Sequence, residues 1–117
     1  MAKSEFKTLH KIEDMMLYGY DALAQFPKAE KFGLAQDIRH CMNELLGLAA
    51  AEEKKRSKRT TIENMDIELA KLQVFVRLAM RKKYISVHRF GVWSGMLVEI
   101  GKMIGGLLKS VSDGPKS

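Results

Sequence analysis

Apolar residues recur at spacings of three and four over most of this 117-residue chain, which is the period of a helix with one buried face. Only Pro27 and Pro115 interrupt the pattern, whereas a small β domain normally has turn signals every ten or so residues. We therefore expect four helices, followed by a polar tail at 111–117. Their predicted bounds are residues 7–26, 29–53, 60–83 and 86–110.

Each predicted helix carries one apolar stripe that we expect to face a common core. The stripe residues, in chain order, are Leu9, Ile12, Met15, Met16, Tyr20, Leu23 and Phe26; then Phe32, Ile38, Cys41, Met42, Leu45, Leu46, Leu48 and Ala49; then Ile62, Met65, Leu69, Leu72, Val76 and Ala79; and finally Val87, Phe90, Trp93, Leu97, Ile100, Ile104 and Leu107.

Three local signals mark helix ends. Proline disfavours the helical conformation in the residue before it, so the first helix is predicted to stop at Phe26 and the next to start just after Pro27. Thr60 and Glu63 have the spacing of a capping box at the start of the third helix, and Ser86 fits the N-cap of the fourth. Short connections make successive helices antiparallel. The sequence therefore predicts an all-α fold, an up-down-up-down antiparallel four-helix bundle, in a single domain over residues 1–117.

The fourth helix is apolar on more than one side, because Val92 and Leu108 widen its stripe beyond one bundle interior. It also contains five glycines, each of which costs about 1 kcal/mol relative to alanine inside a helix. Close packing within the chain is one explanation, and contact with another subunit is the one we favour. The predicted oligomer interface consists of Gly91, Gly95, Met96, Met103, Gly105 and Gly106.

The net charge of +6 is distributed unevenly. Residues 1–53 hold six Lys/Arg and nine Asp/Glu, whereas residues 54–117 hold fourteen Lys/Arg and five Asp/Glu. Cations gather around the last two predicted connections, either as solvated turns or as contacts for a polyanion or an acidic protein surface. The predicted nucleic-acid or partner-binding residues are Lys54, Lys55, Arg56, Lys58, Arg59, Arg77, Arg81, Lys82, Lys83 and Arg89.

The residues that could support catalysis are scattered. His10, His40 and His88 lie on different predicted helices without a second ligand at metal spacing, and Cys41 lies among apolar helix positions, where a thiol is usually inert. No phosphate loop, dinucleotide fingerprint or nucleophile elbow is present. We expect no enzyme activity, metal, cofactor or small-molecule substrate.

The segment 92–108 is interrupted by Glu99 and Lys102 and is too short to cross a bilayer, so we expect no membrane insertion. A single cysteine and an N-terminus without an apolar run favour the cytoplasm.

Several short motifs occur in an order that resembles a known family. They are Tyr20, Phe26-Pro27-Lys28, Phe32-Gly33-Leu34, Tyr84-Ile85-Ser86 and the segment 99–106, which reads Glu-Ile-Gly-Lys-Met-Ile-Gly-Gly. The chain resembles the accessory variability determinant proteins, called Avd, of diversity-generating retroelements. Related proteins of rRNA intervening sequences usually have Asn-Ile-Ala-Glu-Gly late in the second helix. Residues 48–52 read Leu-Ala-Ala-Ala-Glu here, which favours the Avd branch.

The resemblance implies a non-catalytic, basic homopentamer of four-helix protomers that binds a reverse transcriptase and its template RNA. In that role it supports mutagenic cDNA synthesis and retrohoming. The alternative is a general RNA-binding or protein-interaction bundle of the rRNA intervening-sequence type. A protein-interaction bundle of this kind would use its cations only for solubility.

Overall fold

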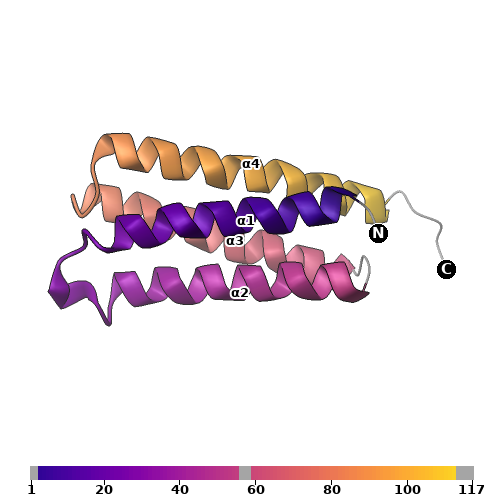
Figure 1. Ribbon diagram of the computed structural model, residues 1–117, viewed down its shortest axis with the longest axis horizontal. Coiled ribbons are helices and arrows are strands. Elements are labelled where there is room, and N and C mark those ends of the chain that lie inside the picture. Colours follow the sequence, from indigo (N-terminus) through magenta and orange to yellow (C-terminus); the bar gives the residue numbers. More distant parts are fainter. Residues whose placement is uncertain (1–2, 56–58, 113–117) are drawn as a thin grey trace.

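A computed structural model describes residues 3–55 and 59–112, with the backbone alone at 3–6, 55 and 112. Within these ranges the chain forms helices and turns. The elements are α1 (Lys3–Leu23), a short 3-10 helix η1 (Lys28–Glu30), α2 (Leu34–Lys55), α3 (Arg59–Arg81) and α4 (Val87–Ser112). Successive α-helices run in opposite directions along a molecule of 50 × 24 × 19 Å (Figure 1). The predicted up-down-up-down antiparallel bundle is confirmed.

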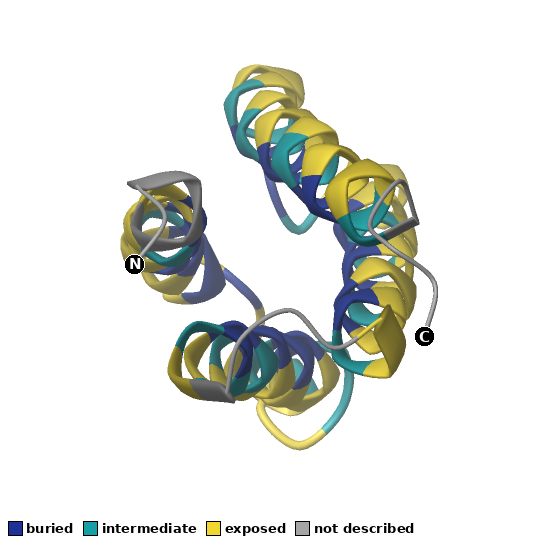
Figure 2. Cartoon of the chain, turned by 90° about the vertical axis from the view of Figure 1, so that its right-hand side faces the viewer, coloured by how far each residue is buried: buried dark blue, intermediate teal, exposed yellow. Residues whose placement is uncertain are grey.

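The four helices form a ring in which each packs against the two beside it, so that α1 and α3 lie across the core from one another. Buried residues face inward on all four helices (Figure 2). Trp93 is fully buried, and its indole N–H points at Met15 Sδ, 3.4 Å away. A Cβ on Gly19 would lie 2.9 Å from the Trp93 ring, so this glycine makes room for the indole.

The predicted stripe of α3 is buried throughout, and most positions of the other stripes are buried or half-buried. Three stripe positions are exposed instead: Tyr20, Phe32 and Val87. Tyr20 lies at the margin of its stripe, where its hydroxyl is 3.5 Å from Asn43 Oδ1. Val87 is the first residue of α4, before the helix reaches the core.

The start of the second helix is a correction to the sequence analysis. Pro27 is followed by the single turn η1 and a further turn, so that α2 begins at Leu34 rather than near residue 29. Phe32 therefore lies outside the helix and cannot join its stripe; the ring is 81% exposed. The physical reason is the carboxylate of Glu30, which accepts the Leu34 N–H at 2.9 Å and so starts the helix there.

The predicted capping box is also wrong. Thr60 is inside α3, which includes Arg59. The Glu63 carboxylate lies 2.9 Å from the Arg59 guanidinium one turn earlier. A full positive charge at this spacing is a stronger partner for Glu63 than the backbone amide of Thr60.

The connection between α3 and α4 has well-defined caps at both ends. The Tyr84 N–H donates to the Ala79 carbonyl and the Lys83 N–H to the Met80 carbonyl, which is the hydrogen-bond pair of a Schellman C-cap. Lys83 occupies the left-handed position of this motif, with a φ of 65° that normally favours glycine. At the other end Ser86 Oγ accepts the Arg89 N–H at 3.0 Å, so the predicted N-cap is confirmed.

The backbone at Lys83 provides a test of the C-cap. Lys83→Gly removes the Cβ that disfavours positive φ, and we expect the free energy of unfolding to rise by about 1 kcal/mol. Ala70→Gly, on an exposed turn of α3, is the control and should lower the same quantity by about 1 kcal/mol. Urea titration followed by circular dichroism measures both, and destabilisation by Lys83→Gly would contradict the assigned cap.

Candidate nucleic-acid interface

Two connections lie at the same end of the bundle, one between α1 and α2 and the other between α3 and α4 (Figure 1). Cations from both gather there, and we call this surface the cationic end. It consists of Lys28, Lys31, Arg81, Lys82, Lys83 and Arg89. The last four of these were predicted from runs of charge along the chain, whereas Lys28 and Lys31 lie outside such runs and were not predicted. The alternating topology predicted from the sequence already places both connections at one end.

Glu30 ties the two connections together. Its carboxylate accepts the Tyr84 hydroxyl at 2.8 Å, in addition to the Leu34 N–H. The Tyr84 ring packs on Phe26, with ring centroids 5.3 Å apart. A methyl group on Gly33 would lie 2.6 Å from Glu30 Oε1, so this glycine leaves space for the carboxylate. The two connections therefore form one surface.

The hydrogen bond from the Leu34 N–H, helped by the Tyr84 hydroxyl and by the charge of Lys82, lowers the pKa of Glu30. The hydrogen bond that the Tyr84 hydroxyl donates to Glu30 is the main reason that the pKa of Tyr84 is raised. Glu30 thus stays ionised, and each of its carboxylate oxygens accepts one hydrogen bond inside the protein. Its charge reduces the positive charge of the cationic end.

Three cations of this end lie over aromatic rings. Lys31 Nζ is 5.6 Å from the Phe32 ring, Lys82 Nζ is 6.0 Å from the Tyr84 ring, and the Arg89 guanidinium is 5.1 Å from the Tyr18 ring. Cation–π contacts hold the charged groups in place while Lys31 and Lys82 stay exposed. Phe32 adds an exposed ring beside cations, which the sequence analysis missed because it placed Phe32 on a helix stripe. The pair Pro27 and Gly33, which brackets a turn, is the signal that could have revealed it.

Of the other predicted cations, Arg77 lies near this end, and the described ones among the rest lie at the opposite end. Arg77 is exposed on α3, one turn before Arg81. At the far end of α3, about 34 Å away for a 23-residue helix, Lys54 is exposed and Arg59 pairs with Glu63. The side chain of Lys55, and Arg56 and Lys58 entirely, lie outside the described residues. The structure thus separates the predicted cations into two groups at opposite ends of the bundle.

The predicted oligomer residues lie along α4. Gly91, Gly95, Gly105 and Gly106 are exposed, and a Cβ on any of them would meet no atom within 4 Å. Packing within the chain therefore does not require these four glycines. Gly101 differs, because its Cβ would approach Leu69 of α3 to 3.3 Å.

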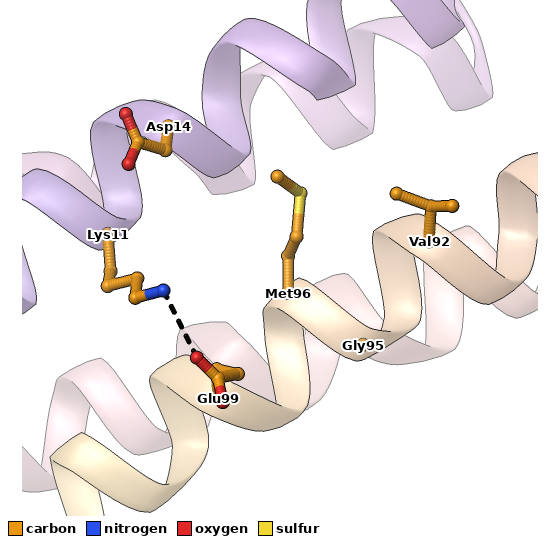
Figure 3. A pocket seen from close by; sticks show the side chains of 6 residues that line it. All are labelled: Lys11, Asp14, Val92, Gly95, Met96 and Glu99. Carbon is orange, nitrogen blue, oxygen red and sulfur yellow. Dashed lines mark ion pairs between the residues drawn. The ribbon is translucent and has the colours of Figure 1, made fainter.

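Met96 and Met103 are half-buried and border shallow grooves between α1 and α4. The groove at Met96, of about 310 Å³, is also lined by Gly95 and Asp14 (Figure 3). Lys11 and Glu99 bridge it with an ion pair of 3.1 Å. The charged groups of Lys11 and Glu99 are thus engaged with one another across the groove.

Comparison with protein families matches residues 7–111 to a family described as bAvd-like. The chain belongs to the bAvd-like family. No curated protein matches it. Membership indicates an accessory protein of the Avd type, and such proteins are non-catalytic accessories. The match confirms the family that the sequence motifs suggested.

Other side chains of this bAvd-like chain have ordinary structural surroundings. Within residues 3–55 and 59–112, no three His, Cys, Asp or Glu side chains gather as a metal site requires. None of the helices described combines the length and apolar character needed to cross a membrane. Cys41 is buried, and its thiol donates to the Glu68 carbonyl at 3.1 Å and lies 3.3 Å from the Glu68 carboxylate.

Burial, reinforced by Glu68, raises the pKa of Cys41 to about 12. At pH 8 roughly one thiol in ten thousand is then ionised, so we expect Ellman's reagent to label Cys41 only after urea unfolds the chain. The pKa of Cys41 is higher in the folded chain than in the unfolded chain, so loss of the thiol proton favours unfolding. The free energy of unfolding should therefore fall as the pH rises from the ordinary thiol pKa toward 12. Rapid labelling of the folded protein at pH 8 would show that the thiol is accessible.

Two glycines provide a matched test of the packing. Gly95→Ala places a methyl group in open space, and we expect the free energy of unfolding to rise by about 1 kcal/mol. Gly19→Ala forces a methyl group against Trp93 and Met42, and the same free energy should fall. Thermal and urea unfolding measure both, and equal effects of the two substitutions would contradict the described packing.

Proposed function

We propose that this bAvd-like chain is a non-catalytic accessory protein of a diversity-generating retroelement, in which it binds template RNA and the reverse transcriptase. The observation that carries the proposal is the cationic end, where two connections bring six Lys/Arg side chains to one end of the bundle, beside the internally bonded carboxylate of Glu30. A surface of this kind attracts a polyanion through its phosphates.

RNA is the polyanion that the family membership favours, and the geometry suits phosphate contacts. The cations come from turns and helix ends rather than from a helix that could enter a groove, so they favour contact with the backbone over reading of bases. Phe32 adds an exposed ring on which an unpaired base could stack. Binding should therefore depend strongly on salt and weakly on sequence.

Self-association is part of the proposal. One copy offers few phosphate contacts, whereas a homo-oligomer repeats these contacts and raises the affinity for RNA through multivalency. The resemblance to Avd proteins implies that this homo-oligomer is a pentamer. The nucleotidyl transfer that makes cDNA would belong to the reverse transcriptase. The accessory protein would hold RNA and enzyme together in the cytoplasm, and in this way support mutagenic cDNA synthesis and retrohoming.

The cationic end can be tested with one substitution from each connection. Lys31→Gln/Lys82→Gln removes two charges that the fold places on one surface. We expect weaker binding of a labelled single-stranded template RNA and a salt slope smaller by about 1.4, at about 0.7 for each lost phosphate contact. Fluorescence anisotropy at several salt concentrations measures both quantities.

Lys102→Gln/Lys109→Gln is the matched control, because it removes the same charge from exposed positions of α4. It should change RNA binding much less than the first pair. Equal effects of the two pairs would show that only net charge matters. If the unaltered chain assembles but retains no RNA at physiological salt, the protein-interaction alternative replaces this proposal.

A further inference from the structure

Phe32 presents an aromatic ring to solvent from the segment 24–33, which connects α1 and α2 at the cationic end (Figure 1). It is 81% exposed, the highest value among the large apolar residues that the structure describes. A single exposed apolar residue needs no explanation by itself. Phe32 differs from such a residue in the way its backbone is held and in the charges around it.

Hydrogen bonds fix the backbone on both sides of Phe32. The Gly33 N–H donates to the Glu30 carbonyl at 2.9 Å. The Lys31 carbonyl, in the peptide group that leads to Phe32, accepts the Arg39 guanidinium at 2.9 Å. A charged donor makes a stronger hydrogen bond than a neutral one. The turn that carries the ring is therefore ordered before a ligand arrives, which lowers the entropy that binding costs.

The charges near the ring favour an anionic ligand. Residues 27–39 contain three cations and two carboxylates, which are Lys28, Lys31, Arg39, Glu30 and Asp37. Both oxygens of Glu30 accept hydrogen bonds within the chain. Asp37 lies in the first turn of α2, where the positive end of the helix dipole offsets its charge. Lys31 Nζ is 5.6 Å from the centroid of the Phe32 ring, so an anion bound to this lysine lies close to the ring.

Other rings near this end have less free surface. Phe26 is buried, and the half-buried Tyr84 ring packs on it at 5.3 Å. Tyr18 is half-buried, and the Arg89 guanidinium lies 5.1 Å from its ring. Phe32 is therefore the ring at this end that is most open to a ligand.

An ordered, exposed ring beside cations matches the two parts of a nucleotide. Proteins that bind single strands combine cations for the phosphates with aromatic rings on which the bases stack. In a duplex each base is paired and stacked between its neighbours, so its face is not available to a side chain. The cations can contact the backbone of either form, whereas the ring distinguishes unpaired bases from paired ones.

We propose that Phe32 stacks on an unpaired base and so raises the affinity of the cationic end for single-stranded RNA without raising its affinity for duplex RNA. The inference rests on the RNA binding proposed above, and it adds the form of RNA and the residue that selects it. Because every base has a face that can stack, this selection concerns unpaired bases rather than a particular sequence.

The test removes the ring and leaves the charges in place. Phe32→Ala should weaken binding of a labelled single-stranded template RNA by about five- to 150-fold, the effect of losing one base–aromatic stack. Binding of the same RNA annealed to its complement should change little. The salt slope should stay that of the unaltered chain, because no phosphate contact is lost. Phe32→Trp keeps a ring that can stack and should bind single-stranded RNA at least as tightly as the unaltered chain. Fluorescence anisotropy measures these affinities, and circular dichroism verifies that each variant folds.

Val87→Ala is the matched control, because it shortens an apolar side chain that is 74% exposed at the start of α4, near the same end, and removes no ring. It should leave both affinities unchanged. The inference is overturned if Phe32→Ala binds single-stranded RNA as tightly as Val87→Ala does, if the two forms of RNA lose affinity equally, or if Phe32→Trp binds as weakly as Phe32→Ala.

In these three cases the unaltered chain still binds RNA, so the proposed function survives. An unaltered chain that binds neither form of RNA would overturn the proposed function together with this inference. If Phe32→Ala keeps its affinity for single-stranded RNA but no longer binds the reverse transcriptase, the ring is a contact for that enzyme and the inference is wrong.

Discussion

The carboxylate of Glu30 is the constraint on which the candidate interface depends. It accepts hydrogen bonds from Leu34, at the start of α2, and from Tyr84, between α3 and α4, and so joins two connections that are 54 residues apart in the sequence. Without this bridge, Lys31 and Lys82 would belong to independent turns. With it, they belong to one surface, and each oxygen of the acid that lies among the cations accepts a hydrogen bond within the chain. The hydrogen bond from Leu34 to Glu30 sets the first residue of α2. One side chain therefore determines both a helix boundary and the composition of the cationic end.

Much of the fold is predictable because periodicity reports burial directly. The stripe from Ile62 to Ala79 is buried at every predicted position, since a single helix face meets the core over its whole length. The Ser86 cap was also predictable, because a serine before an apolar run has few competing partners. Family membership followed from motifs over nearly the whole chain. These features depend on neighbours in the sequence, which is why the sequence reveals them.

The features that the sequence did not reveal depend on competition or on neighbours far along the chain. Thr60 and Glu63 have the spacing of a capping box, but Arg59 competes for the carboxylate. Phe32 continues an apolar period although Glu30 starts the helix after it. The cations of the first connection join those of the second only in three dimensions.

If both connections form one RNA-binding surface, RNA should protect the lysine side chains of both, and lysine footprinting measures this protection. The full chain is acetylated with and without template RNA, and the modification of each lysine is quantified by mass spectrometry. We expect RNA to protect Lys28, Lys31, Lys82 and Lys83 together and to leave Lys102 and Lys109 as reactive as before. Protection of the α4 lysines without the four at the connections, or protection of one connection alone, would contradict this expectation.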